Sequence, residues 1–301
     1  MACYHPLRLF RSNELNEDTG KPYTMVLCHN DPFATKEDFE SRSIPNHFTK
    51  GAVIRAYEEI PCGTCIGCRI DYAKRWTARC LAESYLHDES WFVTLTYDDE
   101  HLPADKLLHK EDLQEFIKKI RRSKKCRYFA CGEYGDSFGR PHYHLILFGL
   151  ALDDARPYCK RGSSTAFTSK WLSKLWNKGF LMIENFDPAC AEYVARYVLK
   201  KRGSWNEPTP PFLLMSRKPG IGYEWFAKQG IKEGRYVLPK GDGTFIICGL
   251  PHYLRVKEGL ELGNAQQLRE RDLAQMSVSG FKNLDDFRGH REFIAKNPAK
   301  V

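Results

Sequence analysis

The stretch CRYFACGEYGDSFGRPHYHLILFG, residues 126–149, decides the fold. Its two halves, CRYFACGEY and PHYHLILFG, are rich in aromatic and aliphatic residues, and the glycine-bearing loop GDSFGR joins them, which predicts a β-hairpin. Side chains alternate along a strand, so His142 and His144 share one face of the second strand with Ile146. Two imidazoles are therefore expected to point from one strand into the same small volume.

Strands and helices alternate around this hairpin. Residues 91–97 and 180–186 are predicted strands, and residues 111–123, 169–179 and 187–203 are predicted helices. The last of these helices begins with an N-cap aspartate, Asp187, and a proline at its first position. The first six elements run βαββαβ, which predicts an α+β fold with a ferredoxin-like, RRM-like core, a central antiparallel sheet with helices on one face.

The composition indicates a folded chain with a polyanionic partner. Of the 301 residues, 42% are hydrophobic, which is enough for a core, and the net charge of +8 favours nucleic acid first and an acidic membrane surface second. The sequence has no run of roughly 18 apolar residues like that of a membrane-spanning helix, and its first residues lack the apolar core of a signal peptide. Eleven cysteines without a secretion signal indicate reduced thiols or metal ligands in a cytoplasm.

A carboxylate accompanies the two histidines. Glu133 lies near the end of the preceding strand and is expected to approach His142 and His144 where the two strands pair. Two histidines and one carboxylate can hold a divalent cation and leave coordination positions open, which catalysis needs. Asp136 is an alternative third ligand, and a pair of core or surface histidines without any metal is the alternative interpretation.

The helix at residues 187–203 carries two tyrosines at helical spacing. Tyr193 and Tyr197 are four residues apart, so they are neighbours on one face, and Lys200 follows one turn later. This face can simply pack on the sheet. A tyrosine can also be a nucleophile, and a phosphodiester that it attacks needs its phosphate polarised by a metal. Lys200 would then offset charge on the phosphate or assist proton transfer.

Three motifs, taken in order, resemble those of a known family. The stretch RPHYHLILFG resembles the His-hydrophobe-His motif of HUH endonucleases, with Tyr143 in the middle place. The stretch YVARYVLKK resembles the paired-tyrosine motif of their rolling-circle replication initiators, and FVTLTYDDEHLP resembles the strand motif that precedes both. The stretches PCGTCIGCR and MSRKPGIG extend the likeness to the initiators of the gokushovirus group of microviruses, which infect bacteria.

The resemblance implies an origin-specific nickase that depends on Mg²⁺ or Mn²⁺. One tyrosine would attack the viral strand and stay attached to its 5′ phosphate, the 3′ hydroxyl would prime synthesis, and the other tyrosine would act when the strand is rejoined into a circle. Glu133 would correspond to the family's third metal ligand. The implied partners are single-stranded and supercoiled viral DNA at the origin, a host helicase and a host DNA polymerase, with no membrane, in the cytoplasm of the bacterial host.

Other functions are compatible with parts of this pattern. An HUH transposase or plasmid relaxase would use the same chemistry, although tyrosines four apart favour a replication initiator. A non-catalytic, zinc-stabilised DNA-binding protein would use the sheet as a binding platform and would form no covalent adduct with DNA. An RNA-binding domain is suggested by the topology alone.

A cysteine cluster precedes the core. Cys62, Cys65 and Cys68 have the spacing C-x2-C-x2-C, which in a cytoplasmic chain indicates a structural metal, usually zinc with four ligands. The candidates for the fourth ligand are Cys3, which we favour, and His5, Cys28 and Cys80. An iron–sulfur cluster or three free thiols are the alternatives.

A basic helix follows the cysteines. The segment RIDYAKRWTARCLAESYLH, residues 69–87, carries four basic residues, of which Arg75 and Arg79 are predicted to contact DNA phosphates. The chain is thus expected to have an N-terminal segment (1–88) with the cysteine site and this helix, an HUH core (89–203) and a C-terminal, partly helical appendage (204–301).

Overall fold

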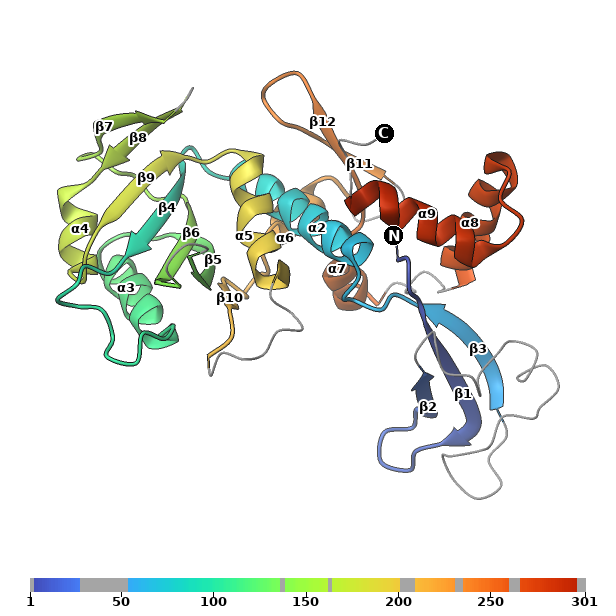
Figure 1. The fold of residues 1–301 in the computed structure, drawn as a ribbon. Helices are drawn as coiled ribbons and strands as arrows, with labels where there is room; N and C mark the ends of the chain where they lie inside the picture. Colours follow the sequence, from blue (N-terminus) through green and yellow to red (C-terminus); the bar gives the residue numbers. More distant parts are fainter. Residues whose placement is uncertain are drawn as a thin grey trace. The chain divides into compact units, whose positions relative to one another are not determined.

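The computed structural model describes residues 3–27, 54–135, 139–161, 164–200, 209–230, 235–259 and 266–296. Side chains are described for these residues except 12–14, 54–57, 161, 196–200 and 266–271. By internal contacts the chain forms two units, one of Met1–Asp71 with Glu261–Val301 and one of Tyr72–Leu260 (Figure 1). The predicted division at residues 88/89 and 203/204 separates the chain by role and stays a prediction.

A seven-stranded antiparallel sheet forms the centre of the unit Tyr72–Leu260. Its order is β10 (Phe212–Met215), β5 (Arg127–Tyr134), β6 (Pro141–Phe148), β4 (Ser90–Thr96), β9 (Leu181–Asn185), β8 (Ser164–Thr168) and β7 (Arg156–Arg161). The helices α3 (Lys110–Ser123) and α4 (Lys170–Trp176) connect β4 to β5 and, after the β7–β8 hairpin, β6 to β9. The predicted βαββαβ core is therefore confirmed, and the β7–β8 hairpin and β10 extend its sheet at both edges.

Helices cover both faces of this sheet. The predicted face carries α3 and α4, whose Leu113 and Trp176 pack with Leu145 of β6 in one core cluster. The opposite face carries α2 (Ile66–Ser84) and α5 (Pro188–Lys200), which pack against Phe129 and Ile146 in a second cluster. Covering helices on this second face were not predicted, but β5 and β6 require them, because both strands are buried along most of their length.

A third cluster joins the later elements of this unit to α2. Helix α6 (Tyr223–Lys228), the hairpin of β11 (Arg235–Pro239) and β12 (Phe245–Gly249), and helix α7 (His252–Lys257) pack on Ala78, Leu81 and Ala82 of α2. The C-terminal third is thus partly helical, as predicted, and it also supplies strand β10 to the central sheet.

The other unit is a small α+β assembly. Strands β2 (Pro22–Leu27), β1 (Leu7–Leu15) and β3 (Ile54–Ile60) form an antiparallel sheet in that order, and the helices are α8 (Gln266–Ser279) and α9 (Leu284–Lys296). The buried Arg288 of α9 bonds Glu59 of β3 at 2.6 Å and Asp272 of α8 at 3.0 Å. A buried charge needs such paired neighbours, so this triad ties the C-terminal helices of the unit to its sheet.

Across the described residues, the helices are all too short or too polar to span a membrane.

Candidate active site and metal centre

Strand pairing brings Glu133 and the two histidines to one place on the sheet. Glu133 lies directly opposite His142 in the β5–β6 pair, and His144 is the next residue along the same face. The Nε2 atom of His144 is 2.8 Å from Oε1 of Glu133, and both side chains are buried. The predicted carboxylate and histidines therefore come from adjacent strands and share one face.

Helix α5 adds a phenol to this group. The hydroxyl of Tyr193 donates to Oε1 of Glu133 at 3.1 Å, the same oxygen that faces His144. The Tyr193 ring also meets the His144 ring edge to face, with centroids 5.0 Å apart. Its side chain is 37% exposed, so the phenol reaches both the buried carboxylate and the surface. Tyr197 and Lys200 belong to the same helix, but their side chains lie outside the described residues.

The two imidazoles each use Nδ1 for a bond to the surrounding protein. Nδ1 of His142 lies 2.7 Å from the carbonyl oxygen of Arg140, and Nδ1 of His144 lies 3.1 Å from the Thr94 hydroxyl. Such outer partners fix the tautomer of a metal-binding histidine and direct its other nitrogen to the metal. Both rings are thus arranged to offer Nε2 as the ligand atom.

The carboxylate of Glu133 has one unsatisfied oxygen. Its Oε2 is buried and has no hydrogen-bond partner within the described parts of the chain. A buried acceptor without a partner costs about 1–3 kcal/mol, so a cation at this place would remove a real penalty. The donor set of one carboxylate and two imidazoles therefore fits a divalent cation.

The His142 imidazole lies apart from the close pair that Glu133 and His144 form. Among the described residues, only a group of four cysteines brings three or more ligand atoms within 4.8 Å of one another. The His142 ring is held by the carbonyl of Arg140 and by Gly135, where a Cβ atom would lie 3.0 Å from it. The alternative ligand Asp136 lies outside the described residues.

Tyr143, between the histidines, points to the opposite face and is structural. Its hydroxyl bonds the Tyr97 hydroxyl at 2.8 Å, and it donates to the carbonyl oxygen of His109 at 2.8 Å. Burial raises the pKa of Tyr143 to about 12. This buried network, completed by Asp112, was not anticipated from the sequence, because the motif requires only an apolar residue at this position.

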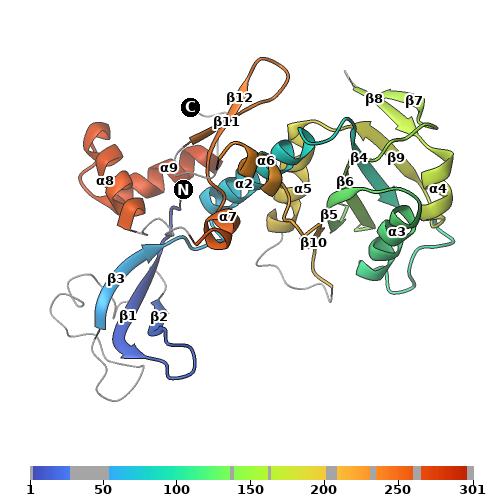
Figure 2. The same ribbon diagram turned by 180° about the vertical axis from the view of Figure 1, so that it is seen from behind.

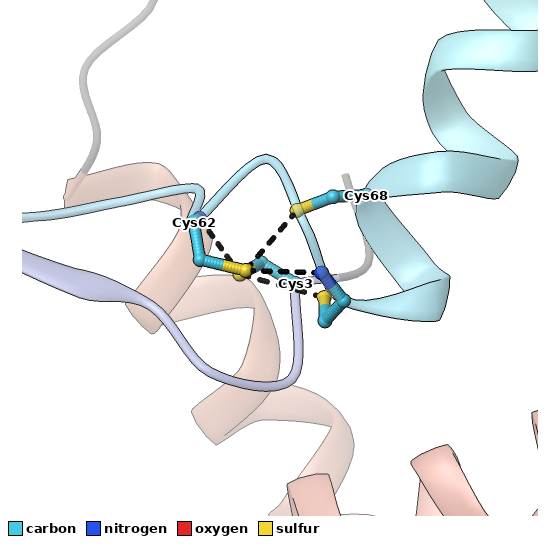
Figure 3. A group of neighbouring side chains, drawn as sticks. Cys3, Cys62 and Cys68 are labelled. Atoms are coloured by element: carbon cyan, nitrogen blue, oxygen red, sulfur yellow. Dashed lines mark hydrogen bonds between the residues drawn. The ribbon is translucent and has the colours of Figure 1, made fainter. Parts of the chain in front are cut away.

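The cysteine site gathers four sulfur atoms. Those of Cys3, Cys62, Cys65 and Cys68 all lie within 4.8 Å of one another (Figure 3). The Cys62 and Cys68 sulfurs are 3.9 Å apart, and the Cys3 and Cys65 sulfurs are 4.0 Å apart. A group of four sulfurs can hold a metal such as zinc.

The structure also separates the candidates for the fourth ligand. Cys3 is the residue that joins the three clustered cysteines, whereas His5 pairs with Glu292 at 2.7 Å. Cys80 is buried in the other unit, and Cys28 lies outside the described residues.

Backbone donors and crowding polarise the four thiols. The N–H groups of Cys62, Cys65 and Tyr4 each donate to a cysteine sulfur at 3.3–3.4 Å. Contact with Cys65 raises the pKa of Cys3, and contact with Cys3 lowers the pKa of Cys65. The group therefore favours a thiolate, which is the form that binds metal.

The two arginines predicted to bind DNA have different environments. Arg79 is only 9% exposed, its Nε donates to the carbonyl of Ile221 at 3.0 Å, and its guanidinium packs over the rings of Trp76 and Tyr253. Burial lowers the pKa of Arg79. Arg79 thus has a structural place, so the predicted phosphate contact is corrected for this residue, and only Arg75, which is exposed, remains a candidate.

The fold and the site together define a class of protein. A βαββαβ sheet that carries two imidazoles and a carboxylate beside a helix-borne tyrosine is the arrangement of an HUH-type α+β protein. The family model of the replication-associated protein ORF2 matches residues 90–202, which cover this arrangement.

Phage proteins are similar over most of the chain. The replication-associated protein VP4 of Bdellovibrio phage phiMH2K is 34% identical over 75% of this chain and 78% of its own length. The replication-associated protein ORF2 of Spiroplasma virus 4 is 35% identical over 84% of this chain and 90% of its own. Replication-associated protein ORF4 of Chlamydia phage 1 is 33% identical over 47% of this chain and 38% of its own. The chain therefore belongs to this family of phage replication-associated proteins, as a rolling-circle initiator of the microvirus type. No solved structure matches it.

Proposed function

We propose that this initiator nicks the viral strand at the replication origin through a tyrosine and later rejoins the strand into a circle. The supporting observation is that the Tyr193 phenol and the His144 imidazole meet at one oxygen of Glu133. A nucleophile suited to phosphodiester attack thereby lies beside an incomplete set of cation ligands.

Glu133, His142 and His144 are the residues proposed to hold Mg²⁺ or Mn²⁺, which when bound supplies Lewis-acid polarisation of the scissile phosphate. The reference pKa of a phenol is about 10, so the attacking tyrosine needs an acceptor for its proton. The Tyr193 hydroxyl already points to Glu133, which orients the phenol and receives that proton. The phenol oxygen then bonds to the phosphorus of the 5′ phosphate, and the bond to the 3′ oxygen breaks.

The 3′ oxygen leaves with a proton and becomes the hydroxyl that primes synthesis. Lys200 is proposed to supply that proton or to offset charge on the phosphate, since it follows the tyrosines by one helical turn. Tyr197 is proposed to cut the regenerated origin after one round, and the released 3′ hydroxyl then displaces the first tyrosine and closes the circle.

The proposed partners are single-stranded and supercoiled origin DNA, with Arg75 as one phosphate contact, and a host helicase and polymerase in the cytoplasm of the bacterial host. We further propose that Cys3, Cys62, Cys65 and Cys68 bind a structural zinc ion. Four sulfurs without a position left for substrate suit a structural site better than a catalytic one.

The test is adduct formation on origin-bearing single-stranded DNA with Mn²⁺, resolved by denaturing electrophoresis. Tyr193→Phe and Tyr197→Phe should each keep some single cleavage and lose repeated rounds of circle release, and the double variant should form no adduct. Tyr158→Phe, which alters an exposed tyrosine of β7, is the control and should behave as wild type. Adduct formation by the double variant would overturn the proposed nucleophiles, and no adduct with the wild type would favour the non-catalytic DNA-binding alternative.

A further inference from the structure

One row of the central sheet runs from the candidate active site to an exposed aromatic residue. Glu133 of β5 lies opposite His142 of β6, and His142 lies opposite Thr96 of β4. Thr96 in turn exchanges two backbone hydrogen bonds of 3.0 Å with Phe180, just before β9. Residues directly opposite each other in an antiparallel sheet present their side chains on the same face. Phe180 therefore lies on the face of Glu133 and His142.

The helix over this face covers only part of it. Helix α5 packs on β5 and β6, and in both ribbon views β9, β8 and β7 extend away from it (Figure 2). Phe180 is 72% exposed, and its neighbours on this face, Thr96 and Met182, are half-buried. An exposed apolar side chain is common on protein surfaces, so exposure alone indicates nothing. Its position in the row of the candidate ligands is what distinguishes Phe180.

The backbone holds Phe180 firmly in this position. The preceding Gly179 is pressed against β4, where an added Cβ would collide with the carbonyl oxygen of Thr96. That same oxygen accepts a 3.0 Å hydrogen bond from the Trp176 indole, and the Asp98 N–H donates to the carbonyl of Lys178 at 3.0 Å. The turn between α4 and β9 is thus bonded to β4 on both sides of the glycine, so the Phe180 backbone cannot withdraw from the row.

We propose that Phe180 stacks on a base of the single-stranded DNA next to the scissile phosphate. The proposal rests on the nicking function, because that function places the phosphate at Glu133 and His142. Two strand spacings, about 10 Å, separate the backbones of His142 and Phe180, so the stacked base belongs to a nucleotide close to the cut. A rigid, exposed ring is suited to the π-face of an unpaired base, whereas the bases of a duplex are already stacked on each other.

The test measures binding of single-stranded origin DNA by fluorescence anisotropy in the presence of EDTA, so that no cleavage contributes. Phe180→Ala should weaken binding about 5- to 100-fold, the range that loss of one base–aromatic stack gives. Phe180→Trp should bind at least as tightly as wild type, and Phe180→Leu should fall between them. Phe245→Ala is the matched control, because its ring is also exposed, at 59%, and lies outside this row.

A second set of oligonucleotides identifies the stacked base. Each carries one abasic site, and the position that matters should weaken binding by wild type and cause no further loss with Phe180→Ala. Equal binding by wild type and Phe180→Ala, or an abasic effect that persists undiminished in the variant, would overturn the proposal. If wild type forms the tyrosine adduct while Phe180→Ala binds normally, only this inference fails. If no adduct forms but Phe180→Ala weakens binding, the nicking function fails and the stacking site stands.

Discussion

At the scale of single residues, the site depends on how one carboxylate is shared. Oε1 of Glu133 serves both Tyr193 and His144, and Oε2 is buried without a partner in the described structure. Leaving Oε2 unsatisfied makes sense only if something else uses it, because the residue is 4% exposed and water has little access. Glu133 thus links the phenol to the cation ligands, and its surroundings determine how well they are oriented.

The Thr94 hydroxyl is such a surrounding group, and its removal makes a residue-scale prediction. Thr94→Val keeps the shape but removes the 3.1 Å partner of the His144 Nδ1, so the imidazole loses its fixed tautomer. Loss of an outer partner of this kind costs about 10- to 100-fold in metal affinity or activity. Cleavage titrated with Mn²⁺ should show the midpoint shift to higher concentration by that factor.

Thr96→Val provides the comparison, because Thr96 lies two residues along the same strand and face, opposite His142 and one position removed from His144. An identical titration for the two valine variants would show that the Thr94 hydroxyl does not orient His144.

At the scale of elements, a buried glutamate joins α2 to the parts of the unit around it. Glu83 of α2 pairs with Arg127 of β5, accepts the Gly222 N–H at 2.6 Å and lies 3.2 Å from His87. Burial alone would raise the pKa of Glu83, but the bonds from His87 and Gly222 and the charge of Arg127 outweigh it and hold the pKa below its ordinary value. This carboxylate therefore stabilises the fold in its charged form.

Glu83→Gln should lower the free energy of unfolding at neutral pH by about 3–5 kcal/mol, the cost of leaving a buried partner charge uncompensated. Because the folded-state pKa is depressed, the stability from Glu83 is fully present above the unfolded value of about 4.3 and is lost as pH falls through the folded value. The gap between wild type and Glu83→Gln should thus narrow in acid below that range, measured by denaturant unfolding at stepped pH.

The control is Glu115→Gln, which removes an exposed carboxylate paired with Lys119 at 3.2 Å. An exposed pair at this helical spacing contributes only about 0.3–0.5 kcal/mol. A constant gap for Glu83→Gln across the acid range, or a loss no larger than that of Glu115→Gln, would contradict the stabilising role of the charge.

At the scale of the whole molecule, the cysteine group lies entirely within one of the two units. Cys3 precedes β1, and the other three cysteines follow β3 and enter α2, so a metal here would close the unit Met1–Asp71 with Glu261–Val301. The sheet, Glu133, both histidines and Tyr193 belong to the other unit. A chelator should therefore act unequally on the two parts.

The purified protein should contain about one equivalent of zinc, as expected for one four-ligand structural site. Removing the metal with a chelator should expose residues of the cysteine-containing unit to limited proteolysis and leave the sheet unit protected. Cys68→Ser should lower the zinc content in the same way, whereas Cys159→Ser, at an exposed cysteine outside the group, should not. Protein without zinc or iron that resists proteolysis in both units would leave the four cysteines as free thiols.

The order of elements and the residue types of the site were predictable from sequence because they depend on local periodicity. The two-residue repeat of a strand puts His142 and His144 on one face, and the four-residue step of a helix does the same for Tyr193 and Tyr197. The spacing of Cys62, Cys65 and Cys68 is equally local. These patterns also carried the resemblance that the phage relatives confirm at the level of a replication initiator.

Tertiary structure alone decided what depends on residues distant in the chain. Local spacing cannot say that Cys3 is the fourth sulfur, because several other cysteines and a histidine were equally free to reach the cluster. Arg79 is basic and helical in sequence, yet residues near 76, 221 and 253 enclose it, so its charge is used inside the unit. Phe180 comes to lie in the row of Glu133 and His142 only because four strands pair in a particular register, and register is a property of the assembled sheet.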